Sequence, residues 1–191
     1  CSILLLASAT LSPLSLIPAA HHIFFWLLSF REAIYHVVKL YQSGHTHITI
    51  LNDINTRRDL FVHYYDNFEK HLYSDKLSKA SEFLWGALAS LIYAIGLAYG
   101  KKLSNHQKIL DFSKEISETE NDSSIYSAVQ EGEQLHANFY HNFMTKENLI
   151  FKRKYIDRLI EKLSLILEKR LKLLEKTFVE ESDFESALNL E

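Results

Sequence analysis

Residues 131–143, EGEQLHANFYHNF, hold the side chains of this chain best suited to chemistry. His136 and His141 can move protons near neutral pH, and the Asn138 amide can hold a phosphate or orient an imidazole ring. The two histidines are five residues apart, about 140° around a helix, instead of the i,i+4 spacing with which two imidazoles share one metal ion. The pattern therefore favours proton transfer over metal binding, with His136 and His141 as the candidate catalytic pair.

Composition narrows the function classes. The net charge of -3 argues against a general electrostatic nucleic-acid binder, although it leaves room for local basic patches. The single cysteine, Cys1, excludes an internal disulfide and a cysteine-based zinc site, and it fits a reducing cytoplasm. No glycine-rich phosphate loop, nucleophile elbow or paired-carboxylate motif is present. We therefore expect no cofactor, no metal site and a cytoplasmic location.

Residues 1–52 form an apolar extension that allows several interpretations. Residues 1–30 contain no Lys, Arg, Asp or Glu, and residues 3–30 are long enough for a membrane anchor. Pro13, Pro18 and adjacent histidines dilute that segment, and it lacks the basic start of a secretory signal. The alternative is a helix over about residues 19–43 that packs on the rest of the protein. Residues 45–51 alternate weakly and could form one short strand.

Residues 53–178 read as one all-α domain, an antiparallel four- to five-helix bundle, followed by an acidic, frayed tail over residues 179–191. Both prolines lie near the start, so no proline interrupts a helix after residue 18. Residues 79–100 are rich in alanine, glycine and leucine at helical spacing and predict a buried central helix. Apolar stripes predict the other helices over residues 56–73, 104–117, about 124–143, and from 145 onward.

Capping residues predict where these helices begin and end. Thr56 and Asp59 have capping-box spacing, as do Ser104 and Gln107. Ser74 and Asp75 are expected to cap the central helix, Gly100 to end it, and Thr145 to cap the last helix.

Three separated blocks resemble a known family of small helical proteins. They are KASEFLWGA at residues 79–87, LSNH at residues 103–106 and LHANFYHNF at residues 135–143. Together they are similar to the archaeal PaREP family of type one, whose members look like relatives of the HEPN helical superfamily. The resemblance covers about residues 56–176. It implies an antiparallel bundle, often dimeric, with no assigned activity, whereas the wider superfamily includes metal-independent ribonucleases and helical partners of small nucleotidyltransferases.

The superfamily's ribonuclease signature is an arginine followed within a few residues by a histidine near a helix end. In this chain His136 stands where the arginine would be and His141 occupies the histidine position. A histidine, mostly neutral near pH 7, stabilises a developing phosphate charge less well than arginine does. This departure favours a non-catalytic association module over the alternative of a degenerate, toxin-type ribonuclease. A membrane-tethered module anchored by residues 3–30 is a further alternative.

The resemblance also suggests where a partner would bind. We expect a homodimer that binds RNA, a nucleotide or a protein such as a nucleotidyltransferase, in a groove near His106, His136, Asn138 and His141. Tyr140, Lys101 and Lys102 complete this set of candidate binding residues. The aromatic residues Phe139, Tyr140 and Phe143 are expected to serve as core or dimer-interface residues more than as base-stacking platforms. The basic clusters at residues 57–58, 101–102 and 152–154 are expected to be solvated helix faces.

Overall fold

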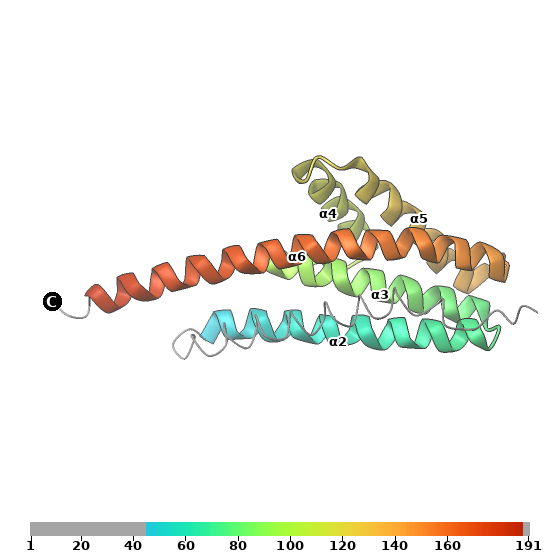
Figure 1. The fold of residues 1–191 in the computed structure, drawn as a ribbon, viewed down its shortest axis with the longest axis horizontal. Helices are drawn as coiled ribbons and strands as arrows, with labels where there is room; N and C mark the ends of the chain where they lie inside the picture. The colour runs from blue at the N-terminus through green and yellow to red at the C-terminus, as the bar shows by residue number, and fades with distance from the viewer. Residues whose placement is uncertain (1–44, 189–191) are drawn as a thin grey trace, which may run out of the picture.

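The computed structural model describes the backbone of residues 45–188 and the side chains of residues 49–177. This part of the chain is all-α and contains no strand, which confirms the predicted fold class (Figure 1). Its helices, labelled as in Figure 1, are α2 (His45–Tyr73), α3 (Leu77–Ala98), α4 (His106–Thr119), α5 (Ser123–His141) and α6 (Lys146–Leu188). The predicted helix over residues 19–43 and the membrane anchor over residues 3–30 lie outside the described residues.

Helix α3 is the centre of the bundle and packs against α2, α4, α5 and α6. Helices α2, α3 and α6 run along the long axis of the molecule, while α4 and α5 form a shorter hairpin beside them (Figure 1). The predicted stripe of α3 is buried at Ala80, Leu84, Leu88, Ile95 and Ala98. Burial of such side chains stabilises the fold by about 1.5–3 kcal/mol each for the larger ones.

Among the described helices, α3 alone is long and apolar enough to span a membrane. However, 72% of its most apolar window is buried inside the bundle, which fits a central core helix.

Several predicted boundaries are confirmed. Gly100 follows α3 with a φ of 68°, a left-handed conformation that glycine adopts without strain. The Thr145 hydroxyl accepts a hydrogen bond from the Asn148 backbone N–H at the start of α6. At α4 the cap is Asn105, one residue after the predicted Ser104, and its side chain accepts from the Lys108 N–H at 2.9 Å.

Two predictions about α2 are wrong. Residues 45–51 are helical, because Leu51, Ile54 and Phe61 form a buried stripe with helical spacing, which outweighs the weak local alternation. Thr56 lies inside the same helix and caps nothing, since its hydroxyl donates to the Asn52 carbonyl one turn earlier at 2.9 Å.

The expected cap of α3 is also wrong. The N-cap is Lys76, which makes no side-chain capping bond. Ser74 instead donates its hydroxyl to the Lys70 carbonyl at the end of α2. Asp75 has a φ of 54° and binds Lys146 at 2.6 Å, so it joins the α2–α3 turn to the start of α6. At the other end of the chain, α6 continues to Leu188, beyond the predicted domain boundary at residue 178.

Candidate functional site

Two of the predicted site residues, His106 and His136, come together on the face of Trp85. The ring centroids of the two histidines are 4.7 Å apart. Those of His106 and Trp85 are 5.3 Å apart, and those of His136 and Trp85 are 6.3 Å apart. Trp85 is 3% exposed and therefore forms the buried floor beneath the two imidazole rings. We call His106, His136 and Trp85 the imidazole cluster.

A carboxylate fixes each imidazole of the cluster. His136 Nδ1 lies 2.7 Å from Glu82 Oε2, and His106 Nδ1 lies 3.0 Å from Glu133 Oε1. An ionised carboxylate only accepts hydrogen bonds, so in each pair Nδ1 is the donor, and Nε2 is the ring nitrogen that the carboxylate does not engage. Two imidazoles in ring contact, each held at Nδ1 by a carboxylate, are a suitable arrangement for proton transfer.

The local fold explains how residues thirty positions apart meet. The Asn105 cap makes His106 the first residue of α4. In α5, Gly132 allows a close approach to α3, because a Cβ there would lie 2.9 Å from Leu88 Cδ2 and 3.3 Å from Trp85 Cζ3. One turn later on α5, His136 therefore reaches both Trp85 and Glu82.

The structure does not bring His141 to His136. His141 is exposed in the last turn of α5, and within the described residues it makes no hydrogen bond or ring contact with His136. Tyr140 does reach the cluster, since its ring packs edge-on against His136 at 5.2 Å and is 67% exposed.

Asn138, a predicted ligand-binding residue, is fully buried. Its Nδ2 donates to the Ser81 hydroxyl on α3 at 2.9 Å, and its Oδ1 accepts from the Met144 backbone N–H at 2.7 Å. The amide thus joins α5, α3 and the α5–α6 turn. Its hydrogen-bonding capacity is directed into the protein, so its visible role is structural.

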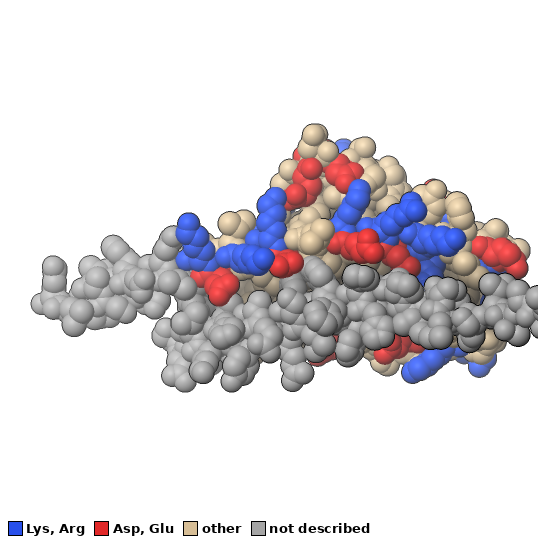
Figure 2. Space-filling view, viewed as in Figure 1, with Lys and Arg blue, Asp and Glu red and all other residues tan. Residues whose placement is uncertain are grey.

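Lys101 and Lys102, the basic residues predicted to bind a partner, have different surroundings. Lys101 forms an ion pair with Glu115 and sits over the Phe112 ring, whereas Lys102 is exposed. Figure 2 shows Lys and Arg intermixed with Asp and Glu over the described part of the displayed face, with no large basic patch.

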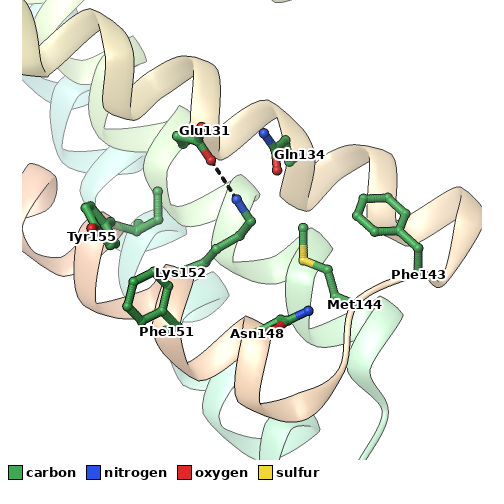
Figure 3. A pocket seen from close by; sticks show the side chains of 9 residues that line it. Glu131, Gln134, Phe143, Met144, Asn148, Phe151, Lys152 and Tyr155 are labelled. Carbon is green, nitrogen blue, oxygen red and sulfur yellow. Dashed lines mark hydrogen bonds and ion pairs between the residues drawn. The ribbon is translucent and has the colours of Figure 1, made fainter.

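A hollow lies between α5 and α6 and was missed by the sequence analysis (Figure 3). Its volume is about 520 Å³. We call it the aromatic groove, and it is lined by Glu131, Gln134, Phe143, Met144, Asn148, Phe151, Lys152, Tyr155 and Ile156.

Three aromatic rings of the groove are open to solvent. Phe143 is 54%, Phe151 59% and Tyr155 49% exposed, and the rings of Phe151 and Tyr155 pack edge-on at 5.2 Å. Of the two roles expected for Phe143, core or dimer interface, its exposure excludes the core, because α5 ends at His141 and Phe143 lies in the turn beyond it. One feature of the sequence could have indicated these exposed rings. Phe151 and Tyr155 form an aromatic i,i+4 pair outside the buried stripe of α6.

An ion pair crosses the groove. Lys152 Nζ on α6 lies 2.7 Å from Glu131 Oε2 on α5, and the pair is drawn as a dashed line in Figure 3. The exposed fractions of the two side chains are 20% for Lys152 and 55% for Glu131. The groove thus combines an apolar, aromatic lining with one charge of each sign.

A second feature missed from the sequence is a half-buried polar network between α2 and α6. Arg153 forms ion pairs with Glu69 and, at 3.4 Å, with Asp157. Tyr65 donates to Asp157 Oδ1 at 2.7 Å and accepts from Arg153 Nη2 at 3.3 Å. Arg153 is only 22% exposed, so the prediction of a solvated basic face at residues 152–154 is wrong for this residue.

Burial dominates the titration of this network. It raises the pKa of Glu69 and of Asp157 above their usual values, although the Arg153 charge acts in the opposite direction. Burial also raises the pKa of the Tyr65 hydroxyl, with the Asp157 charge as the next cause. Tyr65 therefore stays a neutral hydrogen-bond donor over the working pH range.

Within residues 45–188, no group of three or more His, Cys, Asp or Glu side chains is placed to hold a metal ion. The described chain thus offers a pair of carboxylate-held imidazoles, an open aromatic groove and a half-buried ionic network.

These features define the class of protein as an all-α helical bundle built around one apolar core helix. A family model described as the archaeal PaREP1/PaREP8 family matches residues 56–160, more than half of the chain. The chain belongs to this family, as its three sequence blocks predicted. No curated protein and no solved structure matches it significantly. The bundle is compatible with the HEPN superfamily, and that wider relationship stays a prediction.

Proposed function

We propose that this protein is a non-catalytic association module that binds an apolar protein surface through the aromatic groove. The observation that carries the proposal is the hollow of about 520 Å³ lined by Phe143, Phe151 and Tyr155, each about half exposed. Leaving three aromatic rings in water costs free energy that a partner would recover on binding. Apolar clefts with aromatic anchors and a polar rim are typical of protein-binding surfaces.

Charge favours a protein partner over RNA. Lys152 beside the groove is paired with Glu131, Arg153 is committed to Glu69, and Lys101 is committed to Glu115. An RNA-binding surface needs cations that are free to neutralise phosphates. The net charge of -3 supports the same reading. A protein partner, a nucleotidyltransferase among the options, fits this surface better, and the lone Cys1 fits action in the cytoplasm.

The test is site-specific photo-crosslinking in cells. A benzophenone side chain replaces Phe151 or Tyr155 in the full chain, and the matched control carries it at Ile150. Ile150 is 40% exposed and immediately precedes Phe151, but it does not line the groove. Proposed binding predicts crosslinks to protein from positions 151 and 155 and a much weaker crosslink from position 150. Equal yields at all three positions would contradict the proposal, as would crosslinks to RNA.

A second candidate function is metal-independent cleavage of RNA, favoured by the imidazole cluster. One imidazole Nε2 would take the proton of the ribose 2′-hydroxyl as its oxygen attacks the adjacent phosphorus. The other imidazole, protonated, would give a proton to the 5′-oxygen as the P–O5′ bond breaks, which leaves a 2′,3′-cyclic phosphate. The candidate pair is His106 and His136, in place of the predicted His136 and His141, and the ring contact between the former two supports this choice.

Cleavage of labelled single-stranded RNA in EDTA tests this second candidate. Substituting His106→Ala or His136→Ala should abolish cleavage, whereas His141→Ala should retain it, since His141 is exposed and apart from the cluster. Loss of cleavage only in His141→Ala, or no cleavage by the wild-type protein, would remove the His106 and His136 pair from consideration.

A further inference from the structure

We infer that the partner of the aromatic groove is an acidic, amphipathic helix of another protein, which continues from the groove along the outer face of α6. This inference rests on the proposed function and names the chemistry of its partner. A row of exposed side chains on α6 carries it, because the row combines apolar and basic residues at the spacing with which helices pack.

The exposed side chains of α6 follow one line along the helix. Four large apolar residues on this line are 49% to 59% exposed, and three basic residues stand between them. In chain order the row is Phe151, Tyr155, Arg158, Lys162, Leu165, Lys169 and Leu173, and each residue follows the last by three or four positions. Such spacing keeps side chains on one face and is the pattern with which two helices pack along their length. We call this row the outer seam.

The shape of the outer seam fits a helix. From Phe151 to Leu173 it spans about 33 Å, at the helical rise of 1.5 Å per residue. The aromatic groove lies at one end, and an open hollow of about 450 Å³ beside Leu165 and Leu173 lies at the other. In addition, α6 continues beyond the ends of the other described helices (Figure 1). A partner helix along the seam can therefore place apolar side chains in both hollows.

The charge of the outer seam favours an acidic partner. Arg158 is exposed and forms no ion pair with any side chain that the structure describes. Lys169 is 66% exposed and lies 3.3 Å from Glu120, an exposed pair that contributes little stability. Lys162 binds Asp122 at 2.6 Å but stays 46% exposed. The seam itself contains no acidic residue, so carboxylates of a partner helix would meet Arg158 without competition from this chain.

The same features disfavour a second copy, RNA and a membrane as the occupant. Two outer seams facing each other would bring like charges together. Glu120 and Asp122 flank the seam from the α4–α5 turn and would repel the phosphates of RNA or of an anionic membrane. A flat bilayer also does not fill a groove between two helices. A protein helix can instead place its carboxylates opposite the basic residues and away from these two acids.

Binding of two synthetic peptides to the purified full chain tests this inference. Both peptides form amphipathic helices of about 22 residues, the length of the seam, with leucine at three- and four-residue spacing. One carries glutamate beside the leucines and the other carries lysine. Fluorescence anisotropy should show roughly tenfold or more tighter binding of the glutamate peptide. Phe151→Ser should weaken that binding by roughly tenfold, because it removes an aromatic anchor.

A charge reversal makes the test specific to the outer seam. Arg158→Glu combined with Lys169→Glu should reverse the preference, so that the lysine peptide binds more tightly than the glutamate peptide. Binding of the lysine peptide also shows that this variant is folded. The matched control is Lys108→Glu combined with Lys114→Glu, which changes the net charge equally at two exposed positions of α4. This control should keep the preference of the wild type.

The outcomes separate this inference from the proposed function. Equal affinities of the wild type for the two peptides, or binding of neither, would overturn the acidic helix. Equal effects of the two double variants would overturn it as well, and so would tighter binding of phosphatidylserine vesicles or single-stranded RNA than of the glutamate peptide. Crosslinks to protein from positions 151 and 155 would in each case leave the association function in place.

Discussion

Arg153 on α6 forms an ion pair with Glu69 on α2, although both helices pack mainly on α3 and make few direct contacts with each other. The guanidinium also lies 5.5 Å from the centre of the Phe68 ring, which is fully buried. Arg153 therefore links the two outer helices of the bundle over the core.

Removing the cation should destabilise the protein. Arg153→Met leaves the carboxylates of Glu69 and Asp157 without their positive partner, and both are about one-quarter exposed or less. We expect a loss of about 2 kcal/mol in the free energy of unfolding, measured by urea denaturation. The control is Lys154→Met, since Lys154 is exposed on the same helix. Equal urea midpoints for Arg153→Met and Lys154→Met would show that the network contributes little to the stability of the fold.

The same network makes stability depend on pH. Because burial raises the pKa of Glu69, the folded state holds its proton more tightly than the unfolded chain does. The Glu69 contribution is therefore most favourable below the ordinary glutamate pKa of about 4.3 and is lost as pH rises through the raised folded value.

Glu69→Gln tests this dependence because glutamine does not titrate. We expect its free energy of unfolding to fall less steeply than that of the wild type as pH rises from about 4 toward neutrality. Asp122 affects stability in a more acidic pH range. A hydrogen bond from Lys162 lowers the pKa of Asp122 to about 2, so its favourable contribution to stability is lost only as pH falls below about 4. If the free energies of unfolding of wild type and Glu69→Gln changed in parallel above a pH of about 4, the raised pKa of Glu69 would be refuted.

Asn138 should matter for stability and not for a ligand. Asn138→Leu keeps a similar volume but leaves the buried Met144 backbone N–H without its acceptor, and we expect a loss of about 2 kcal/mol in thermal or urea unfolding. The comparison variant is Asn142→Gly, since Asn142 ends α5 with a φ of 46° that glycine also adopts. If Asn138→Leu left the free energy of unfolding unchanged, the Met144 backbone N–H would have found another acceptor.

The sequence predicted the bundle well because its signals there are local and repeated. The stripe of α3 continues through several turns, and a long apolar period of this kind predicts burial against other helices. The family match over residues 56–160 agrees with the three blocks that suggested it. Residues 45–51 were mispredicted, since their few alternating residues carry less information than the packing of Leu51 and Ile54.

The sites were harder to predict because they depend on contacts between distant helices. His106 and His136 meet only because Gly132 brings α5 against Trp85, which no spacing along one helix reveals. His141, chosen for its distance along the chain from His136, faces solvent instead. Likewise, Arg153 lies in a basic run typical of a solvated face, but its partner Glu69 stands on another helix, and spacing along α6 does not reveal it.

Binding of protein in the aromatic groove is tested most directly by crosslinking from three positions. Benzophenone at position 151 samples the groove, at position 150 the adjacent surface, and at position 140 the approach to the imidazole cluster. The proposed function predicts that position 151 gives the dominant crosslinked product and that this product is protein. A dominant crosslink to RNA from position 140, with none from position 151, would contradict it and favour cleavage of RNA at His106 and His136.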